Sequence, residues 1–313
     1  PIILVARYLP TVNAVSEHQL DWMGAFYRIV SVASLLMALL QAEVFGYWVI
    51  PLLAISAVGG ILLVRQEKRT PEPLFPLALW RNRVIIAGNL GGLVVGAAMM
   101  GVSAFLPTFI QGVMGKTPLE AGSILAMMSI GWPLASTLSG RLMLWTSYRF
   151  TAMLGGIVLI IGSLTLLTVQ PDSNLIWARL AAFLIGSGMG LSSTTFLVSI
   201  QNSVDYTIRG IATASAMFTR MLGSALGTAI LGATLNIGLH WRLPEVSDPL
   251  QTLMDPAKRI LLSVNQLDML ASQVASSIHG VFIVSALIAA ITLLSARMIP
   301  ASQRPGQAET RQK

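Results

Sequence analysis

Carboxylates are the side chains that usually carry protons within a membrane, and in this chain they avoid the middles of the apolar segments. Those that border such segments fall at segment ends or in loops: Asp21, Glu43, Glu120, Asp172 and Asp205. An intramembrane carboxylate is the usual proton carrier of a pump or transporter. No carboxylate in this chain is placed to supply that role.

The remaining reactive side chains do not form a catalytic or metal-binding pattern. His18, His240 and His279 are scattered without the spacing of metal ligands, and the chain has no cysteine. A G-x-x-x-x-G-K-S/T phosphate loop is absent, and the apolar segments lack the acid and the central histidine of a Ser–His–Asp triad. We therefore expect no enzyme, no ATP-driven pump, no metal and no cofactor.

Weakly polar and polarisable residues gather in the apolar segment Val84–Ile110 and just after it. Three are polar and three are apolar: Asn89, Ser103, Gln111, Met99, Met100 and Phe105. Thioethers, an aromatic ring and a few amides suit a pocket that accepts varied lipophilic molecules. These six residues are candidates for a substrate cavity, and the alternative is that they face lipid or neighbouring helices.

Charged residues near one membrane boundary could hold the helices in position or gate transport. Asp205 and Arg209 precede the segment Ile211–Leu239, and Arg220 lies within its polar first part. Because Met221–Leu239 alone is long enough to span a membrane, we expect Arg220 at the boundary with the other two. An ion pair among these residues is the gating hypothesis.

Prolines and glycines could bend or pack the apolar segments. Pro107 and Pro133 should each free a backbone carbonyl and kink a helix. Gly223 and Gly227 have the four-residue spacing that lets two helices approach closely. We interpret the four as helix-bending and helix-packing positions.

The composition places these residues in a membrane. Of 313 residues, 54% are hydrophobic and only 11% are charged, whereas soluble domains carry roughly a quarter charged residues. The net charge of +7 is spread between apolar segments, which fits membrane topology better than a nucleic-acid-binding face.

A spanning helix needs about 20 mostly apolar residues. Eight segments qualify: Trp22–Leu40, Phe45–Val64, Val84–Ile110, Leu119–Leu144, Phe150–Val169, Leu175–Ile200, Ile211–Leu239 and Ser277–Met298.

The apolar runs are long and lack period-two alternation, which excludes a β-barrel reading and predicts an all-α membrane protein with about eight transmembrane helices. The charged linker 65–83, with Pro71, Pro73 and Pro76, divides a central helix pair (21–64) from a six-helix block (84–300). Residues 1–20 are expected to hold the tail of a preceding helix and a loop, and 301–313 a terminal tail. The chain begins with Pro1 and shows no signal peptide, so we expect a fragment whose upstream part is absent.

Basic residues predict the orientation. One side would collect fourteen: Arg7, Arg65, Lys68, Arg69, Arg81, Arg83, Arg141, Arg149, Arg209, Arg220, Arg297, Arg304, Arg311 and Lys313. The other side would hold five: Lys116, Arg179, Arg242, Lys258 and Arg259, while Arg28 lies within the first segment. The excess predicts a multi-pass protein of the cell (inner) membrane with both chain ends cytoplasmic.

The region 240–280 is too polar to span a membrane. After Pro256, apolar residues recur at helical spacing: Ile260, Leu261, Val264, Leu267, Leu270, Val274 and Ile278. We expect an amphipathic helix that lies on the outer face and covers the ends of the neighbouring spans, with gating or partner contact as alternatives.

Several stretches resemble the fourteen-helix drug:proton antiporter branch of the major facilitator superfamily, which comprises multidrug exporters. The resemblance covers about Tyr8 to Pro300 and is strong in the order and spacing of its motifs: Leu106–Gly115 (LPTFIQGVMG) with Ala121-Gly122, Arg209–Gly227, Leu20–Gly24 and Pro76–Arg83. One departure is that Gly140–Arg149 lacks the acid of the family's inter-helix loop motif, which puts only its gating role in doubt.

The resemblance implies a central helix pair followed by the C-terminal six-helix domain, built from two inverted three-helix repeats. It implies alternating-access export of lipophilic, often cationic, drugs in exchange for protons, with the proton-carrying acids in an absent N-terminal half. The implied partners are small lipophilic substrates, protons, the lipid bilayer and that half; nucleic acid is not among them, and no adaptor protein is indicated. The alternatives are a narrower exporter, of a siderophore or a self-made antibiotic, and a non-transporting membrane sensor or scaffold.

The orientation generates a direct prediction. Since the chain has no cysteine, single cysteines introduced at Thr70 and Gln307 should react with an impermeant maleimide only from the cytoplasmic side, and one at Ser247 only from outside. Labelling in intact cells and in inverted vesicles measures both. Reaction of the Thr70 position from outside would reverse the orientation.

Overall fold

The computed structural model describes residues 21–41, 45–70, 77–246 and 248–301, and within these ranges the regular structure is helical. Eight helices are long and apolar enough to cross a membrane, as the sequence predicts. They are α2 (Trp22–Leu40), α4 (Val49–Glu67, preceded by the 3-10 turn Gly46–Trp48), α5 (Arg83–Thr108), α6 (Pro118–Trp145), α7 (Tyr148–Leu167), α8 (Leu175–Gln201), α9 (Arg209–Arg242) and α12 (Val264–Met298). The predicted fold class is confirmed.

Polar residues at the ends of the apolar runs start the helices. Lipid offers no hydrogen bonds, so a spanning segment must satisfy its backbone internally and can leave free N–H groups only near the surface. At the start of α6, Thr117 and Glu120 form a reciprocal capping box. The side chains of Asn82, Ser147 and Asn174 cap α5, α7 and α8, each by accepting one backbone N–H of the first turn. Each turn between spans therefore also defines where the next helix begins.

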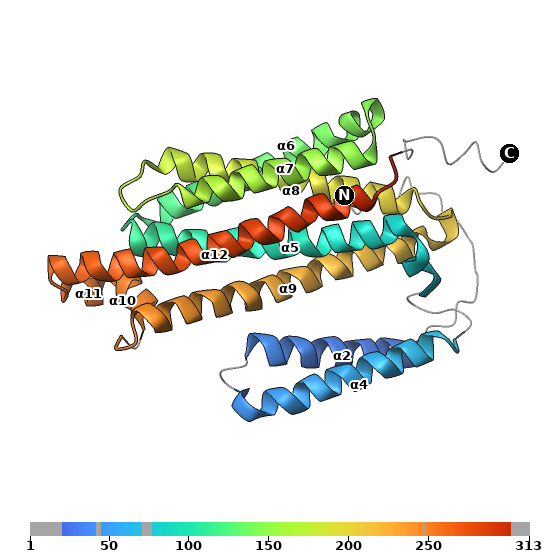
Figure 1. Cartoon of the computed structure of the whole chain (residues 1–313), viewed down its shortest axis with the longest axis horizontal. Coiled ribbons are helices and arrows are strands. Elements are labelled where there is room, and N and C mark those ends of the chain that lie inside the picture. The colour runs from blue at the N-terminus through green and yellow to red at the C-terminus, as the bar shows by residue number, and fades with distance from the viewer. Residues whose placement is uncertain (1–20, 42–44, 71–76, 247, 302–313) are drawn as a thin grey trace, which may run out of the picture.

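The six long helices α5, α6, α7, α8, α9 and α12 form one bundle with a regular pattern of contacts (Figure 1). Helix α8 packs against α6 and α7, whereas α5 packs against α9 and α12, and α7 contacts α12. The first helix of each run of three therefore packs on the second and third helices of the other run. The two runs are interleaved, and neither forms a core of its own.

Glycines allow the closest of these contacts. Gly223 lies against the backbone of Leu93, and Gly96 lies against the carbonyl of Arg220, which brings α9 and α5 into backbone contact. Between α8 and α6, Gly186 and Gly190 lie against the carbonyls of Met128 and Trp132. Small residues at such positions are how helices approach closely in membranes, where no hydrophobic effect drives them together.

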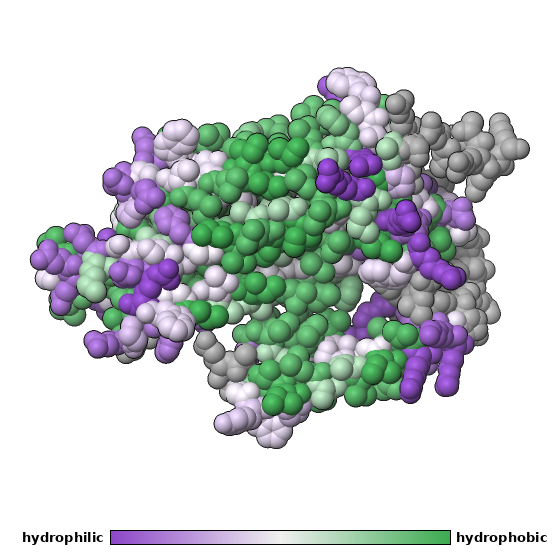
Figure 2. Space-filling model, in the orientation of Figure 1, coloured by the Kyte–Doolittle hydropathy of each residue, from purple (hydrophilic) through white to green (hydrophobic). Residues whose placement is uncertain are grey.

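Helices α2 and α4 pack mainly on each other, and α2 touches the bundle at α9 (Figure 1). Their contact includes Gly59 against Ser31, whose hydroxyl donates to the carbonyl of Ser56 at 2.8 Å. A belt of hydrophobic side chains covers the visible face of both parts and ends in hydrophilic residues at each side (Figure 2). The belt is the surface that a bilayer would cover.

Alternating helix directions bring the start of α2 and the ends of α4, α8 and α12 to one end of the molecule (Figure 1). Basic residues at that end include Arg65, Arg83, Arg149, Arg209 and Arg297. The helix directions thus agree with the segregation of charge assumed above. That this end faces the cytoplasm stays a prediction.

The region 240–280 differs from the expectation of a separate surface helix. Two short helices, α10 (Pro249–Met254) and α11 (Pro256–Ile260), precede a single long α12 that begins at Val264. A capping box of Ser263 and Gln266 starts α12, and no proline interrupts it, so it continues straight into the membrane span. The expected surface helix after Pro256 was therefore wrong.

The apolar residues after Pro256 belong to two different elements and not to one surface helix. Leu270, Val274 and Ile278 are buried against the bundle, whereas Ile260 and Leu261 are more than four-fifths exposed. The buried positions belong to the outer turns of α12 that pack on the bundle. The exposed ones belong to α11 and the turn after it.

Other boundaries differ by smaller amounts. Helix α4 continues to Glu67, so the first residues of the expected linker 65–83 are helical, while 71–76 lie outside the described residues. Helix α5 continues past Pro107 into a π-helical turn, Phe109–Val113, closed by the Met114 N–H on the Phe109 carbonyl at 3.1 Å. The expected tails 1–20 and 302–313 also lie outside the described residues.

Replacing Gly227 with Leu should destabilise the bundle. A methyl group at Gly227 would lie 2.5 Å from the Cα of Ala97, which is backbone and cannot move aside. Overpacking of this kind costs about 1–3 kcal/mol, so we expect a lower midpoint in thermal unfolding of the purified chain in detergent.

The matched control is Gly232→Leu on the same helix, where nothing lies within 4 Å of an added methyl group. It should unfold like the unaltered chain. Equal midpoints for the two variants would contradict the close contact of α9 with α5.

Candidate functional site

Arg220 lies about a third of the way along α9. Its carbonyl lies against Gly96, which is about 20 Å along α5 from Arg83 at 1.5 Å per residue. Arg220 is itself about 16 Å from the start of α9 at Arg209. Helix α9 has 34 residues and so is about 20 Å longer than the roughly 30 Å hydrocarbon core of a bilayer, and the expected place of Arg220 at the boundary stays a prediction.

A small cavity lies beside Arg220, where α5, α8 and α9 meet. Its volume is about 30 Å³, room for roughly two waters. Glycines on α5 form its floor, and side chains of α8 and α9 form its walls: Gly88, Gly92, Ser193, Phe196, Leu197, Ala216, Met217 and Arg220. The absence of side chains on the two glycines is what leaves this space open.

The guanidinium of Arg220 is the charged group of this cavity. It stays protonated at any physiological pH and offers five N–H donors in a planar fork. Within the described ranges 21–41, 45–70, 77–246 and 248–301, no side chain forms an ion pair with it. A half-buried cation on a helix long enough to span a membrane needs water or an anionic partner, because an unpaired charge in hydrocarbon is costly. Such residues mark functional sites in membrane proteins.

Hydroxyl groups continue the polar side of α9 beyond Arg220. Ser224 and Thr228 follow at four-residue steps and are half-buried. Their hydroxyls donate to the carbonyls of Arg220 and Ser224 at 3.2 and 2.9 Å, so each keeps its acceptor lone pairs available. The row can accept hydrogen bonds along about two turns of the helix.

The face of α5 that forms the cavity floor carries two of the predicted cavity residues. Met99 and Ser103 follow Gly92 by seven and eleven residues, so all three share one side of the helix. Met100 and Gln111 lie beside this face and are also half-buried, with Gln111 in the π-helical turn. The π-bulge is a feature that recurs at functional sites.

The other two predicted cavity residues lie elsewhere. Asn89 is fully buried between α5 and α9, where its Oδ1 accepts from the hydroxyls of Ser215 and Thr219, both at 3.3 Å. Its Nδ2 has no hydrogen-bond partner among the described residues. Phe105 packs against the main hydrophobic core on another side of α5. The six candidates therefore do not form one cluster.

The predicted gating residues are also separated. Arg209 begins α9, where its Nε donates to the carbonyl of Gln201 at 3.0 Å and its guanidinium lies 5.6 Å from the centre of the Tyr206 ring. Asp205 precedes the 3-10 turn Tyr206–Ile208. Both belong to the turn between α8 and α9, far from Arg220 along the helix. They anchor that turn, whereas Arg220 faces the cavity.

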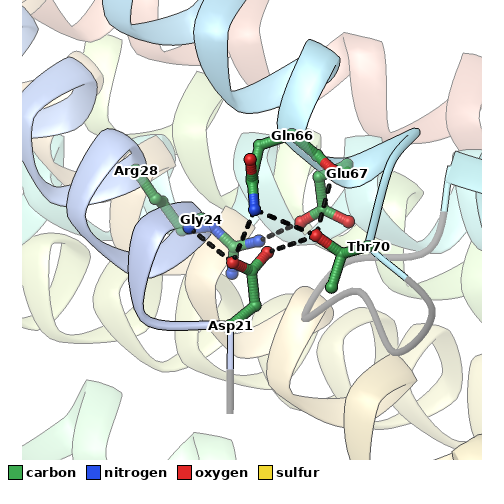
Figure 3. A network of polar contacts seen from close by, with 6 residues as sticks. All are labelled: Asp21, Gly24, Arg28, Gln66, Glu67 and Thr70. Carbon is green, nitrogen blue, oxygen red and sulfur yellow. Dashed lines mark hydrogen bonds and ion pairs between the residues drawn. The ribbon is translucent and has the colours of Figure 1, made fainter. Parts of the chain in front are cut away.

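A second polar cluster joins the boundary ends of α2 and α4 (Figure 3). An Nη2 of Arg28 lies 3.1 Å from an Oε1 of Glu67, whose side chain is only 2% exposed. Asp21 caps α2 by accepting from the Gly24 N–H at 2.8 Å. Snorkelling alone therefore does not describe Arg28, because it also binds a carboxylate of the neighbouring helix.

Two further residues connect the ends of the pair. The Nε2 of Gln66 donates to Asp21 at 3.2 Å and to the Thr70 hydroxyl at 3.1 Å, and that hydroxyl lies 3.4 Å from Asp21 (Figure 3). Glu67 was missed because it follows Arg65 in a segment that reads as a charged linker. Its signal was its position one turn after the end of an apolar run.

Histidines take no part in either cluster. His279 hydrogen-bonds through Nε2 to the Val169 carbonyl at 2.9 Å and packs beside Phe109 and Phe282, which joins α12 to the end of α7. No group of three or more His, Cys, Asp or Glu side chains that could hold a metal occurs among the described residues. His18 lies outside them.

Comparison with known sequences identifies relatives of the chain. The family model of the Major Facilitator Superfamily matches residues 12–228. The chain is 30% identical over 239 residues to the multidrug transporter protein MdtP of Bacillus subtilis, which covers 75% of this chain and 44% of that protein. It is 26% identical to multidrug resistance protein 3 of the same organism, covering 74% and 46%. It thus spans less than half the length of these two relatives.

Two further comparisons widen this picture. The chain is 26% identical over 250 residues to the tetracycline resistance determinant of Streptomyces rimosus, covering 76% of this chain and 71% of that protein. Among solved structures, it resembles a bacterial homologue of the human lysosomal transporter Spinster in an inward-facing, occupied conformation. That match has a TM-score of 0.53 at 15% identity and covers 88% of this chain and 65% of the other, which shows a shared fold.

Proposed function

The chain belongs to the major facilitator superfamily, a family of secondary transporters and not of enzymes, and on that premise we propose that it is the C-terminal part of a proton-coupled exporter of lipophilic compounds. Export would proceed by alternating access, with substrate bound near the bilayer midplane between two halves. The names of the multidrug relatives support lipophilic, often cationic, substrates.

The observation that carries the proposal is the intramembrane cation Arg220 beside a small cavity on the bundle. A buried charge without a partner in its own domain suits a surface that another domain completes. Ser224 and Thr228 on α9, with Met99 and Ser103 on α5, would extend this surface toward the outer side. Their mix of hydroxyls and thioethers suits loosely specified, lipophilic ligands.

The positions of the charged residues indicate which half of the transporter would carry the proton. No carboxylate is found in the middle of a described span, so the proton carrier would belong to an N-terminal half. A carboxylate of that half facing Arg220 would neutralise it in one state of the cycle. Protonation of the carboxylate would break the pair and leave Arg220 exposed, which couples proton entry to rearrangement.

Residues 84–300 would form the C-terminal domain, with two interleaved three-helix runs related as inverted repeats. The pair 21–64 would be a separate element, joined by the linker 65–83 and flanked by 1–20 and 301–313. The contacts of α5 with α9 and α12, matched by those of α8 with α6 and α7, support the repeat. The weak contact of α2 with α9 supports the separate pair.

A narrower exporter is the second candidate. The tetracycline resistance determinant carries the name of a single antibiotic and matches most of this chain. If Arg220 contacted the substrate directly and were not neutralised by the other half, acidic or strongly polar substrates would bind better than cationic ones. Transport of a panel of dyes and antibiotics distinguishes a broad substrate range from a narrow one.

The chain alone should insert into membranes but not transport. Helices α5 to α12 would supply one wall of a cavity that needs two. The experiment reconstitutes the chain in liposomes with an imposed proton gradient and follows a fluorescent cationic dye. Co-expression with the N-terminal half of MdtP is the positive control. Gradient-driven dye movement by the chain alone would refute the half-transporter proposal and indicate a self-sufficient machine.

In the completed transporter, Arg220→Gln should lower gradient-driven export roughly 10- to 100-fold, the scale of one lost charged hydrogen bond. Arg220→Lys should retain part of the rate, because it keeps the charge but not the planar fork. The matched control is Arg242→Gln, the same change at the exposed outer end of α9, which should leave export unchanged. Equal rates for both glutamine variants would remove Arg220 from the mechanism.

A further inference from the structure

An apolar groove runs along the outside of the bundle between α7 and α12. Its volume is about 520 Å³, and its walls are Met153 and Ile157 on α7 and Leu287, Ala290, Ile291 and Leu294 on α12. Most of these side chains are strongly exposed, including Leu287 at 64% and Leu294 at 60%. The groove therefore opens to the bilayer and not to the cavity beside Arg220.

Small residues shape the groove. Gly156 lets α7 touch α12 so closely that a methyl group there would lie 3.0 Å from Leu293 and 3.4 Å from Thr292. Beside this contact, Ala290 is too short to fill the space that its larger neighbours enclose. Helices α7 and α12 touch at Gly156, and beside this contact their side chains leave a channel that runs parallel to the helix axes.

The length of the groove matches one leaflet. From Leu287 to Arg297 the helix rises about 15 Å at 1.5 Å per residue. The hydrocarbon core of a bilayer is about 30 Å thick, so this is about half of it. The groove ends at Arg297, at the basic end of the molecule where α12 also ends.

Two arginines lie at similar heights at that end, Arg297 in the lining of the groove and Arg149 on α7. Arg149 precedes Met153 by one turn of α7 and lies on the same side of that helix. From the contact of Gly156 with Leu293, Arg149 lies about 10 Å and Arg297 about 6 Å along the axes, so their heights differ by about one turn or less. Figure 2 shows hydrophilic side chains gathered at this end of the apolar face.

The two helices that form the groove carry no acid at this end, and Asp205, of the turn between α8 and α9, lies at the same end of the bundle. Helix α7 has no acidic residue, and the acidic residue of α12, Asp268, lies near its opposite end. The N-terminus of α7 adds the positive end of its helix dipole at the same place. The rim of the groove is therefore suited to a phosphate, whereas a headgroup carrying its own cation would be repelled.

We propose that this groove is a binding site for an anionic phospholipid, with one acyl chain along Met153, Ala290 and Leu294 and its phosphate held by Arg149 and Arg297. Arginine matches phosphate geometry through paired N–H donors. Basic pockets between transmembrane helices are known to bind lipid headgroups. The proposal requires that the chain lies in a membrane, and it does not depend on which substrate is exported.

Native mass spectrometry of the purified 313-residue chain tests the site, with phosphatidylglycerol and phosphatidylcholine of matched acyl chains added in detergent. We expect retention of phosphatidylglycerol over phosphatidylcholine. The double variant R149Q/R297Q should lose that preference, by roughly fivefold for each arginine. The control pair R65Q/R141Q removes two exposed arginines at the same end, on α4 and α6, and should keep it.

A third variant tests the contribution of the apolar groove to lipid binding independently of the two arginines. Ala290→Phe fills the channel without changing charge and should weaken binding of both lipids. Thermal unfolding without added lipid verifies that each variant is folded. The site is rejected if R149Q/R297Q keeps the preference, if the control pair loses it equally, or if Ala290→Phe binds lipid like the unaltered chain.

Discussion

Backbone contact between helices at glycines is the interaction on which the rest of this bundle depends. Lipid satisfies no backbone hydrogen bonds and gives no hydrophobic gain when two helices meet, so association depends on close packing. Gly223 and Gly227 bring α9 onto α5 at Leu93 and Ala97, and Gly96 receives the carbonyl of Arg220. That contact determines the depth of Arg220. The only charged side chain lining the cavity is thus positioned by residues that have no side chain.

The number and type of helices could be predicted because they follow from local properties. An apolar run of sufficient length must become a helix in lipid whatever its neighbours are. The start of α12 could not be placed in this way, because hydropathy marks where a helix leaves the membrane and not where it ends. Ser263 and Gln266 did carry a local signal, the capping box, which shows that the helix begins well outside the apolar segment.

The candidate site was harder to predict because it depends on the register between helices. Met99 and Ser103 stay predictions that rest on their residue types, and Asn89 is buried against α9, which no local pattern reveals. Arg220 was recognised from its type, but its place opposite Gly96 depends on how far α9 slides along α5. The contact of Arg28 with Glu67 joins two helices across a turn and needed the packing of the pair. The register between packed helices is a tertiary property, and it cannot be derived from the local pattern of a single sequence.

A charge of α9 within the hydrocarbon core, as we propose for Arg220, would have an electrical consequence. A charge within the hydrocarbon lies inside the transmembrane electric field, and carrying one elementary charge through the full potential involves about 2.3 kcal/mol per 100 mV. A rocking motion that shifts the position of Arg220 within that field, or exposes it to water on one side, performs electrical work. The voltage across the membrane would therefore bias which conformation the bundle prefers, even for a substrate that carries no charge.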